Sequence, residues 1–105
     1  MKPIELITGT HSLLSDRVRL AIMATLAGVG DPVDFNTLLT SLKLTKGNLS
    51  SHVRKLEESG LLKVTKKFVE RKPKTTYECT KAGRREVRNY LKKIEALLSS
   101  TQAPS

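Results

Sequence analysis

The spacing of apolar residues changes twice along this chain of 105 residues, and these changes limit what it can fold into. Up to residue 59, apolar residues recur every three or four positions, which predicts amphipathic helices. From Leu62 to Cys79 the chain has two β-rich runs around a short polar loop, which predicts an antiparallel hairpin. Helical spacing returns after Thr80. A chain of this length forms one domain, so these elements are expected to share one core.

Capping residues mark where the predicted helices begin and end. Asp34 and Thr45 suit helix N-caps because their side-chain oxygens can accept backbone N–H groups, and Gly60 suits a left-handed C-cap. Ser15 or Asp16 can cap the main body of the first helix. The predicted elements are a helix over 12–27, a very short strand around Val33, helices over 34–42 and 45–59, strands over 62–70 and 75–79 around a loop at 71–74, and a helix over 81–98. This order, helix-helix-helix-hairpin-helix, predicts a winged helix-turn-helix, mainly α with a small β-hairpin (α+β).

Positive charge is concentrated in one part of the chain. Lys and Arg number 19 against 10 Asp and Glu, a net charge of +9. Residues 1–42 carry a net −1, whereas residues 43–93 hold 16 basic and five acidic residues, a net of +11. Nucleic acid is the commonest partner for such an excess, although an acidic protein or an anionic membrane surface also fits the total. Because the excess lies over a helix and a hairpin, its distribution favours duplex DNA over a membrane.

The predicted helix over 45–59 has the chemistry of a helix that reads base edges. With Leu49 facing inward, small and hydrogen-bonding residues point outward or flank that face near its N-terminus. Small residues allow close approach, and an Asn amide can pair with adenine. We therefore predict base contacts by Gly47, Asn48, Ser50 and Ser51, and phosphate contacts by Thr45, Lys46, Arg54 and Lys55. The alternative is an ordinary solvated helix face.

The predicted hairpin places five cations within nine residues. Such a wing can lie along phosphates or insert Arg71 or Lys72 into a narrow minor groove. The alternative is edge protection, in which lysines discourage unwanted strand pairing. The predicted wing contacts are Lys66, Lys67, Arg71, Lys72 and Lys74.

Several segments together resemble a known family. Residues 44–62 are similar to the recognition-helix signature of MarR/ArsR-type winged-helix regulators. Residues 68–77 and 80–84 resemble the wing and the start of the closing helix, and residues 15–22 resemble the opening helix. The similarity extends over residues 12–98 and is greatest to the small stand-alone winged-helix DNA-binding subgroup.

This resemblance implies a homodimeric, DNA-binding transcriptional regulator of a bacterium or archaeon. Such proteins bind pseudo-palindromic operators and place one recognition helix in each of two major grooves. The paired cysteines of metal-sensing ArsR proteins are absent, and the chain is shorter than a full MarR protein. The resemblance therefore implies neither metal-released repression nor a particular effector, and any small-molecule effector stays unknown.

The last predicted helix carries a wide apolar stripe, and further apolar residues precede the first helix. A second copy of the chain would bury both, and the alternative is that the helix packs only on its own first helix. The predicted dimer interface is Leu6, Val87, Tyr90, Leu91, Ile94, Leu97 and Leu98. We thus divide the chain into an N-terminal arm (1–11), a DNA-binding domain (12–98) that includes the dimerisation helix 81–98, and a flexible tail (99–105).

Neither catalysis nor metal binding is expected, and no cofactor is implied. His11 and His52 lie far apart in the sequence, and Cys79 has no second cysteine. His52 is expected to be a packed or capping residue, and Cys79 a small core residue. The absence of a signal peptide and of a span of about 20 apolar residues predicts a soluble, cytoplasmic protein at the nucleoid, with no membrane partner. The alternative functions are a winged-helix module that binds an acidic protein, and RNA binding.

Overall fold

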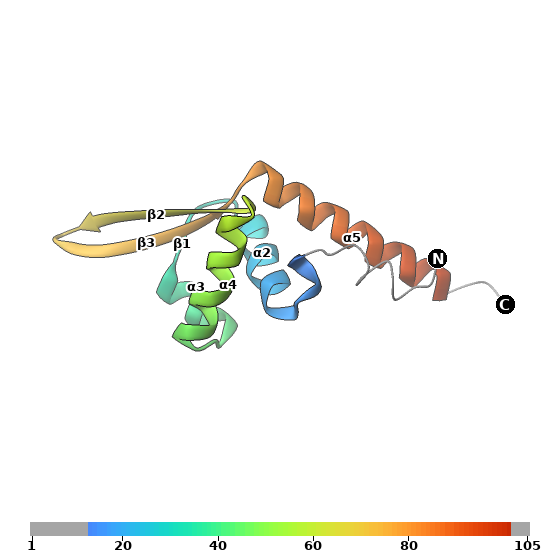
Figure 1. Cartoon of the computed structure of the whole chain (residues 1–105), viewed down its shortest axis with the longest axis horizontal. Coiled ribbons are helices and arrows are strands. Elements are labelled where there is room, and N and C mark those ends of the chain that lie inside the picture. The colour runs from blue at the N-terminus through green and yellow to red at the C-terminus, as the bar shows by residue number, and fades with distance from the viewer. Residues whose placement is uncertain (1–12, 102–105) are drawn as a thin grey trace.

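A computed structural model describes residues 13–101 of the chain. The elements in chain order are η1 (Leu13–Ser15), α2 (Arg17–Val29), β1 (Val33–Asp34), α3 (Phe35–Leu42), α4 (Lys46–Glu58), β2 (Leu62–Val69), β3 (Lys72–Cys79) and α5 (Lys81–Thr101). The predicted order of helices and hairpin is confirmed, and so is the winged helix-turn-helix fold. The molecule measures 62 × 24 × 24 Å; the hairpin of β2 and β3 projects at one end and α5 extends toward the other (Figure 1).

Three of the helices begin at the caps that the sequence predicts. The Asp16 carboxylate accepts the backbone N–H groups of Val18 (2.8 Å) and Arg19 (3.0 Å). Asp34 accepts from Thr37, and Thr45 caps α4 in the same way. The cap at Asp16 divides the helix predicted over 12–27 into η1 and α2, because Asp16 itself has an extended backbone.

The core lies where the helices meet the sheet. Its fully buried side chains come from η1, α2, α3 and α4, so each helix contributes one face, as their apolar spacing predicts. These side chains are Leu14, Ile22, Met23, Leu26, Leu38, Leu49 and Leu56. Tyr77 on β3 and Val87 on α5 close the core from the other side.

The sheet is antiparallel, in the order β1-β3-β2. β1 is as short as predicted and pairs Val33 with Tyr77. The predicted loop over 71–74 is wrong, because β2 and β3 pair up to Val69 and Lys72 and leave only Glu70 and Arg71 in the turn. Both turn residues have positive φ values, 52° and 66°, and this geometry matches the twist of the paired strands.

Pro73 therefore lies within β3 and not in a loop. Val69 and Lys72 flank the two-residue turn, so they occupy a hydrogen-bonded pair position and the next pair, Phe68 and Pro73, does not. A missing N–H costs nothing at such a position, which is why the strand tolerates proline there.

α5 begins at a tightly packed junction. Thr80 Oγ1 donates to the Gly60 carbonyl (2.7 Å) and accepts from the Gly83 N–H (2.9 Å), which caps α5. The Gly83 position is so close to the backbone of Leu61 that a Cβ there would collide with its carbonyl, and it would lie 2.8 Å from Met23 Cε. Glycine at 83 therefore sets how closely α5 approaches the rest of the domain.

Candidate nucleic-acid interface

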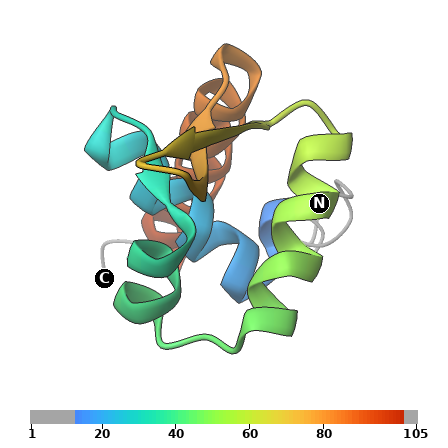
Figure 2. The same cartoon turned by 90° about the vertical axis from the view of Figure 1, so that its left-hand side faces the viewer.

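One face of α4 is turned away from the core. Leu49, Val53 and Leu56 are buried, and the predicted contact residues lie on the remaining surface of the helix. The residues predicted to meet bases or phosphates are all exposed: Thr45, Lys46, Gly47, Asn48, Ser50, Ser51, Arg54 and Lys55. Figure 2 views the molecule from the hairpin end, and in this view α4 lies at the outer edge of the molecule.

The N-terminal turn of α4 is small and polar. Thr45 Oγ1 accepts the Asn48 backbone N–H at 3.1 Å, so the cap uses the main chain of Asn48 and leaves its amide for other partners. Apart from its chain neighbours and the backbone of α4, nothing in residues 13–101 comes within 4 Å of where a Cβ on Gly47 would lie. This end of the helix is therefore open to close approach, and the helix dipole favours an anion there.

A polar network holds α4 against α2. Arg19 Nη1 donates to His52 Nδ1 (3.3 Å), and Arg19 Nε donates to the Leu13 carbonyl (2.7 Å). Because a guanidinium only donates, His52 Nδ1 is the acceptor, and its Nε2 faces Asp16 Oδ1 at 4.0 Å. His52 is thus a packed residue, as predicted. The sequence pattern did not indicate Arg19, whose partner lies 33 residues away.

This network also affects the carboxyl of Asp16. The backbone hydrogen bond from Arg19 is the largest influence and lowers the pKa of Asp16, with a further lowering by the charge of Arg19 and by the backbone hydrogen bond from Val18. Asp34 has a lowered pKa for the same main reason, a backbone hydrogen bond from Thr37, and the charge of Lys74 adds to it. Both caps are therefore stabilised as carboxylates.

The five predicted wing cations are all exposed, but the structure divides them between two faces of the hairpin. Lys66 shares its face with Val64 and lines a groove with Ser50 and Arg54 of α4. Lys67 and Lys74 lie directly opposite each other on the other face, where Lys72 follows, and Arg71 is in the turn. Like charges in facing positions destabilise a hairpin, so this pair favours an anionic partner.

The hairpin also carries an apolar side chain whose exposure to solvent the alternating pattern did not reveal. Phe68 is 77% exposed, with Pro73 opposite it in the register and half-exposed Val69 beside it. The alternation does place Phe68 on the face of the core residues Leu62 and Val64, but the hairpin at this point has passed beyond the helices.

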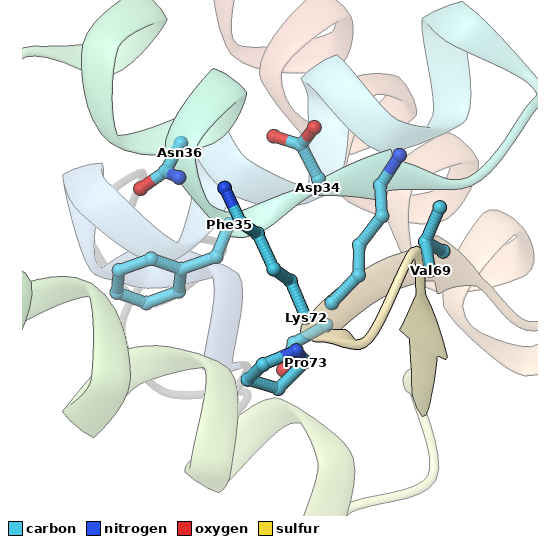
Figure 3. Close-up of a pocket in the computed structure, with 8 residues that line it drawn as sticks. Asp34, Phe35, Asn36, Val69, Lys72 and Pro73 are labelled. Atoms are coloured by element: carbon cyan, nitrogen blue, oxygen red, sulfur yellow. The ribbon is translucent and has the colours of Figure 1, made fainter.

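A shallow hollow separates the start of α3 from β3. Asp34, Phe35 and Asn36 line one side, and Lys72, Pro73 and Lys74 are among the residues on the other (Figure 3). The hollow lies between the turn end of the hairpin and the start of α3. Because its lining includes wing cations, it belongs to the same basic surface.

The apolar stripe of α5 is partly used within the chain itself. Val87 and Tyr90 are buried in the chain's own core, and Ile94 packs against that core. Leu97 is half-buried, whereas Leu91 is 45% exposed. Leu98 is also more than half exposed, and Leu6 lies outside the described residues. The apolar surface that α5 leaves exposed is therefore narrower than the predicted dimer interface.

Two further features concern the range 13–101. No cluster of three or more His, Cys, Asp or Glu side chains occurs there that could hold a metal ion, and no helix there is long and apolar enough to cross a membrane. Cys79 is half-buried against the core, as predicted, and its Sγ donates to the Thr80 carbonyl (3.4 Å). Burial raises the pKa of its thiol.

Comparison with known proteins assigns this arrangement to a family. Residues 18–98 match the family model of the winged helix DNA-binding domain. The chain is 39% identical over 77 residues to an uncharacterized protein of Methanocaldococcus jannaschii, a match that covers 73% of this chain and 83% of the relative.

Solved structures agree with this match. A transcriptional regulator homologue from Pyrococcus horikoshii superposes with a TM-score of 0.87 at 34% identity, over 97% of this chain and 99% of that one. A zinc-responsive MarR family member from Lactococcus lactis has the same fold, with a TM-score of 0.60 at 20% identity, over 82% of this chain and 58% of that protein. The predicted resemblance to MarR-type regulators is thus confirmed, and the chain belongs to the winged helix DNA-binding domain family of transcriptional regulators.

Proposed function

We propose that this protein is a sequence-specific transcriptional regulator that binds duplex DNA as a homodimer. α4 enters the major groove, and the wing lies on the phosphate backbone or in the minor groove. The observation that carries the proposal is the open face of α4, on which all eight predicted contact residues are exposed beside a basic hairpin. The family is one of DNA-binding domains, not of enzymes, which supports the same role.

The small residues at the N-terminal end of α4 recognise the base sequence in this proposal. Asn48, Ser50 and Ser51 carry the hydrogen-bonding groups, and Gly47 lets the helix approach the base edges. The remaining exposed polar side chains bind phosphates and set the register of the protein on the duplex. These are Thr45, Lys46, Arg54 and Lys55. Lys66 extends this positive surface from α4 onto the wing, because it lines the same groove as Arg54.

The homodimer is supported by the distal part of α5. This helix extends beyond the helical body, and Leu91 exposes apolar surface on it. Two copies paired through Leu91, Leu97 and Leu98, together with Leu6 of the arm, would bury this surface across a two-fold axis. A two-fold dimer reads a pseudo-palindrome, with half-sites about 10 base pairs apart or a multiple of that. As a proposed DNA-bound regulator, the protein is expected with the nucleoid in the cytoplasm.

Selection from random duplexes tests the proposal directly. The full chain is expected to enrich one pseudo-palindromic sequence, with affinity that falls steeply as salt rises. The double variant Arg54→Ala, Lys72→Ala should weaken binding and reduce the slope of log affinity against log salt by about two. An unchanged affinity of this variant for every duplex would contradict the DNA proposal.

Two competitors separate the alternative functions. Structured RNA of equal length, if it displaces the duplex, indicates RNA binding. Failure to bind any duplex, together with salt-dependent capture of an acidic protein, indicates a protein-interaction module. A matched control, Lys43→Ala, changes an exposed cation outside the predicted contacts and is expected to leave the selected sequence unchanged.

A further inference from the structure

The end of the wing presents an apolar surface that the fold itself does not use. Phe68 is 77% exposed, more than any other large hydrophobic residue in the range 13–101. Its facing residue is Pro73, and these two side chains lie on the same side of the hairpin. A lone exposed apolar residue needs no explanation, but a ring and a proline at the end of a projecting hairpin form a patch, which indicates contact with a partner.

The position of this patch relative to α4 follows from the strand register. Val64, Lys66 and Phe68 alternate along β2 on one face, and Val64 and Lys66 line the groove with α4. Phe68 therefore continues the face that α4 shares, farther along the hairpin. A partner that lies against α4 and the wing together meets Phe68 and Pro73.

Charge identifies the chemistry of that partner. The segment from residue 66 to 74 holds five cations and one acidic residue, Glu70. The apolar pair is bordered by Lys66 on its own face and by Lys67 and Lys74 on the other. The partner is therefore anionic at its edges and apolar within. The minor groove of duplex DNA has this character, with phosphates along both walls and stacked bases between them.

We propose that Phe68 and Pro73 form an apolar wedge that enters the minor groove beside the site bound by α4 and partly unstacks one base step. This inference rests on the proposed function, because it requires duplex DNA to be bound. Apolar side chains inserted in this way kink the duplex. Pyrimidine–purine steps unstack most easily, so Phe68 selects such a step without hydrogen-bonding to any base. Phe68 is thus a specificity-determining residue on the wing.

The test compares two duplexes that differ only where the wing reaches. One carries a TA step at that position and the other carries an A-tract, and both keep the half-sites selected by the wild-type chain. 2-Aminopurine at the step reports unstacking, and energy transfer between dyes at the two ends reports bending. The wild-type chain should raise the 2-aminopurine fluorescence, bend the TA duplex and bind it more tightly.

The main variant is Phe68→Thr, which keeps strand propensity and removes the ring. It should bind the TA duplex about tenfold more weakly, the order expected for losing one aromatic contact with bases, and should no longer prefer it over the A-tract duplex. Its salt slope should stay unchanged because no phosphate contact is lost. Phe68→Leu keeps an apolar wedge and should restore most of the preference. Circular dichroism checks that each variant is folded, as expected for so exposed a side chain.

Lys67→Ala is the matched control, since it removes a neighbouring phosphate contact. It should lower the salt slope by about one and leave the fluorescence change intact. Equal affinity, bending and fluorescence for Phe68→Thr and the wild type would overturn the wedge while leaving DNA binding established. Failure of the wild type to bind any duplex would overturn the proposed function itself. If Phe68→Thr loses binding to vesicles of anionic lipid but binds the duplexes as the wild type does, the patch contacts a membrane surface. The wedge would then be rejected.

Discussion

Three helical glycines within residues 13–101 differ in what surrounds them, and this difference distinguishes a glycine that the fold requires from one that serves function. Gly83 lies against the backbone of Leu61, so a side chain there has no room. Gly28 and Gly47 both have open space where a Cβ would be. Gly28 is near the end of α2, whereas Gly47 is on the exposed face of α4. Glycine weakens a helix, and nothing in the described part of the chain requires it at 47.

We therefore expect Gly47→Ala to stabilise the fold and weaken DNA binding. The free energy of unfolding should rise by about 0.5–1 kcal/mol, because alanine loses less backbone entropy on folding. Affinity for the selected duplex should fall, because the added methyl group would face the base edges in the proposed complex. Urea unfolding followed by circular dichroism measures the first effect, and fluorescence anisotropy with a labelled duplex measures the second.

Two glycine variants serve as controls for this prediction. Gly28→Ala should give a similar gain in stability with no loss of DNA affinity, since Gly28 is near the end of α2 and is not among the predicted contact residues. Gly83→Ala should destabilise the fold by about 1–3 kcal/mol, because the added Cβ collides with the Leu61 backbone. Equal DNA affinity of Gly47→Ala and Gly28→Ala would show that the open turn of α4 does not approach the bases.

At the scale of the element, the N-cap of α2 connects that helix to α4. Asp16 closes the first turn of α2 and faces His52 of α4, so one carboxylate acts on two helices. Its pKa is lowered, so its contribution to stability is fully present above its ordinary pKa of about 3.9 and is lost as the pH falls through the folded value. Asp34, the cap of α3, also has a lowered pKa and follows the same rule.

The prediction is a loss of stability below about pH 4 that depends on these carboxylates. Asn is as good an N-cap as Asp but does not titrate, so Asp16→Asn should differ from the wild type less at pH 3 than at pH 7. Thermal unfolding followed by circular dichroism across this range measures the difference. Asp16→Ala also removes the cap and should cost about 1 kcal/mol more than Asp16→Asn at any pH. A stability difference between Asp16→Asn and the wild type that does not vary with pH would contradict the role of the charge.

At the scale of the whole molecule, the wing and the distal part of α5 lie at opposite ends of the 62 Å axis, with α4 between them. The proposed DNA contacts and the proposed contact with a second copy therefore use separate surfaces. Residues that serve the dimer can be changed without touching the wing. Exposed Leu91 on α5 is the clearest of these, because its neighbours Val87 and Tyr90 are already buried in the chain's own core.

Leu91→Lys should convert the dimer to a folded monomer. The substitution places a charge where the two copies would meet in the proposed dimer, so sedimentation equilibrium should report half the mass of the wild type. Affinity for the full pseudo-palindrome should fall more than affinity for a single half-site. Val29→Lys is the matched control, because Val29 is exposed to a similar degree (53%) at the end of α2. A wild-type chain that sediments as a monomer, or an unaffected Leu91→Lys variant, would contradict the dimer.

The sequence by itself determined the local structure of this protein. Apolar spacing located the helices and strands, and Asp16, Asp34 and Thr45 set helix starts, because caps and periodicity act within a few residues. The exposed face of α4 followed from the same periodicity once Leu49 faced inward.

Only the tertiary structure decided what depends on distant parts of the chain. The turn consists of Glu70 and Arg71, because strand pairing and twist set the register of the hairpin. Neither turn residue is a glycine, so the sequence did not indicate this position. Packing on α2 and the sheet, not the stripe on α5, decided that Val87 is buried while Leu91 is exposed. Alternation places Phe68 on the same face of the hairpin as Leu62 and Val64. Phe68 is nevertheless exposed, because the hairpin extends beyond the helices at this point. A strand pattern indicates the face on which a side chain lies, but not whether another element packs against that face.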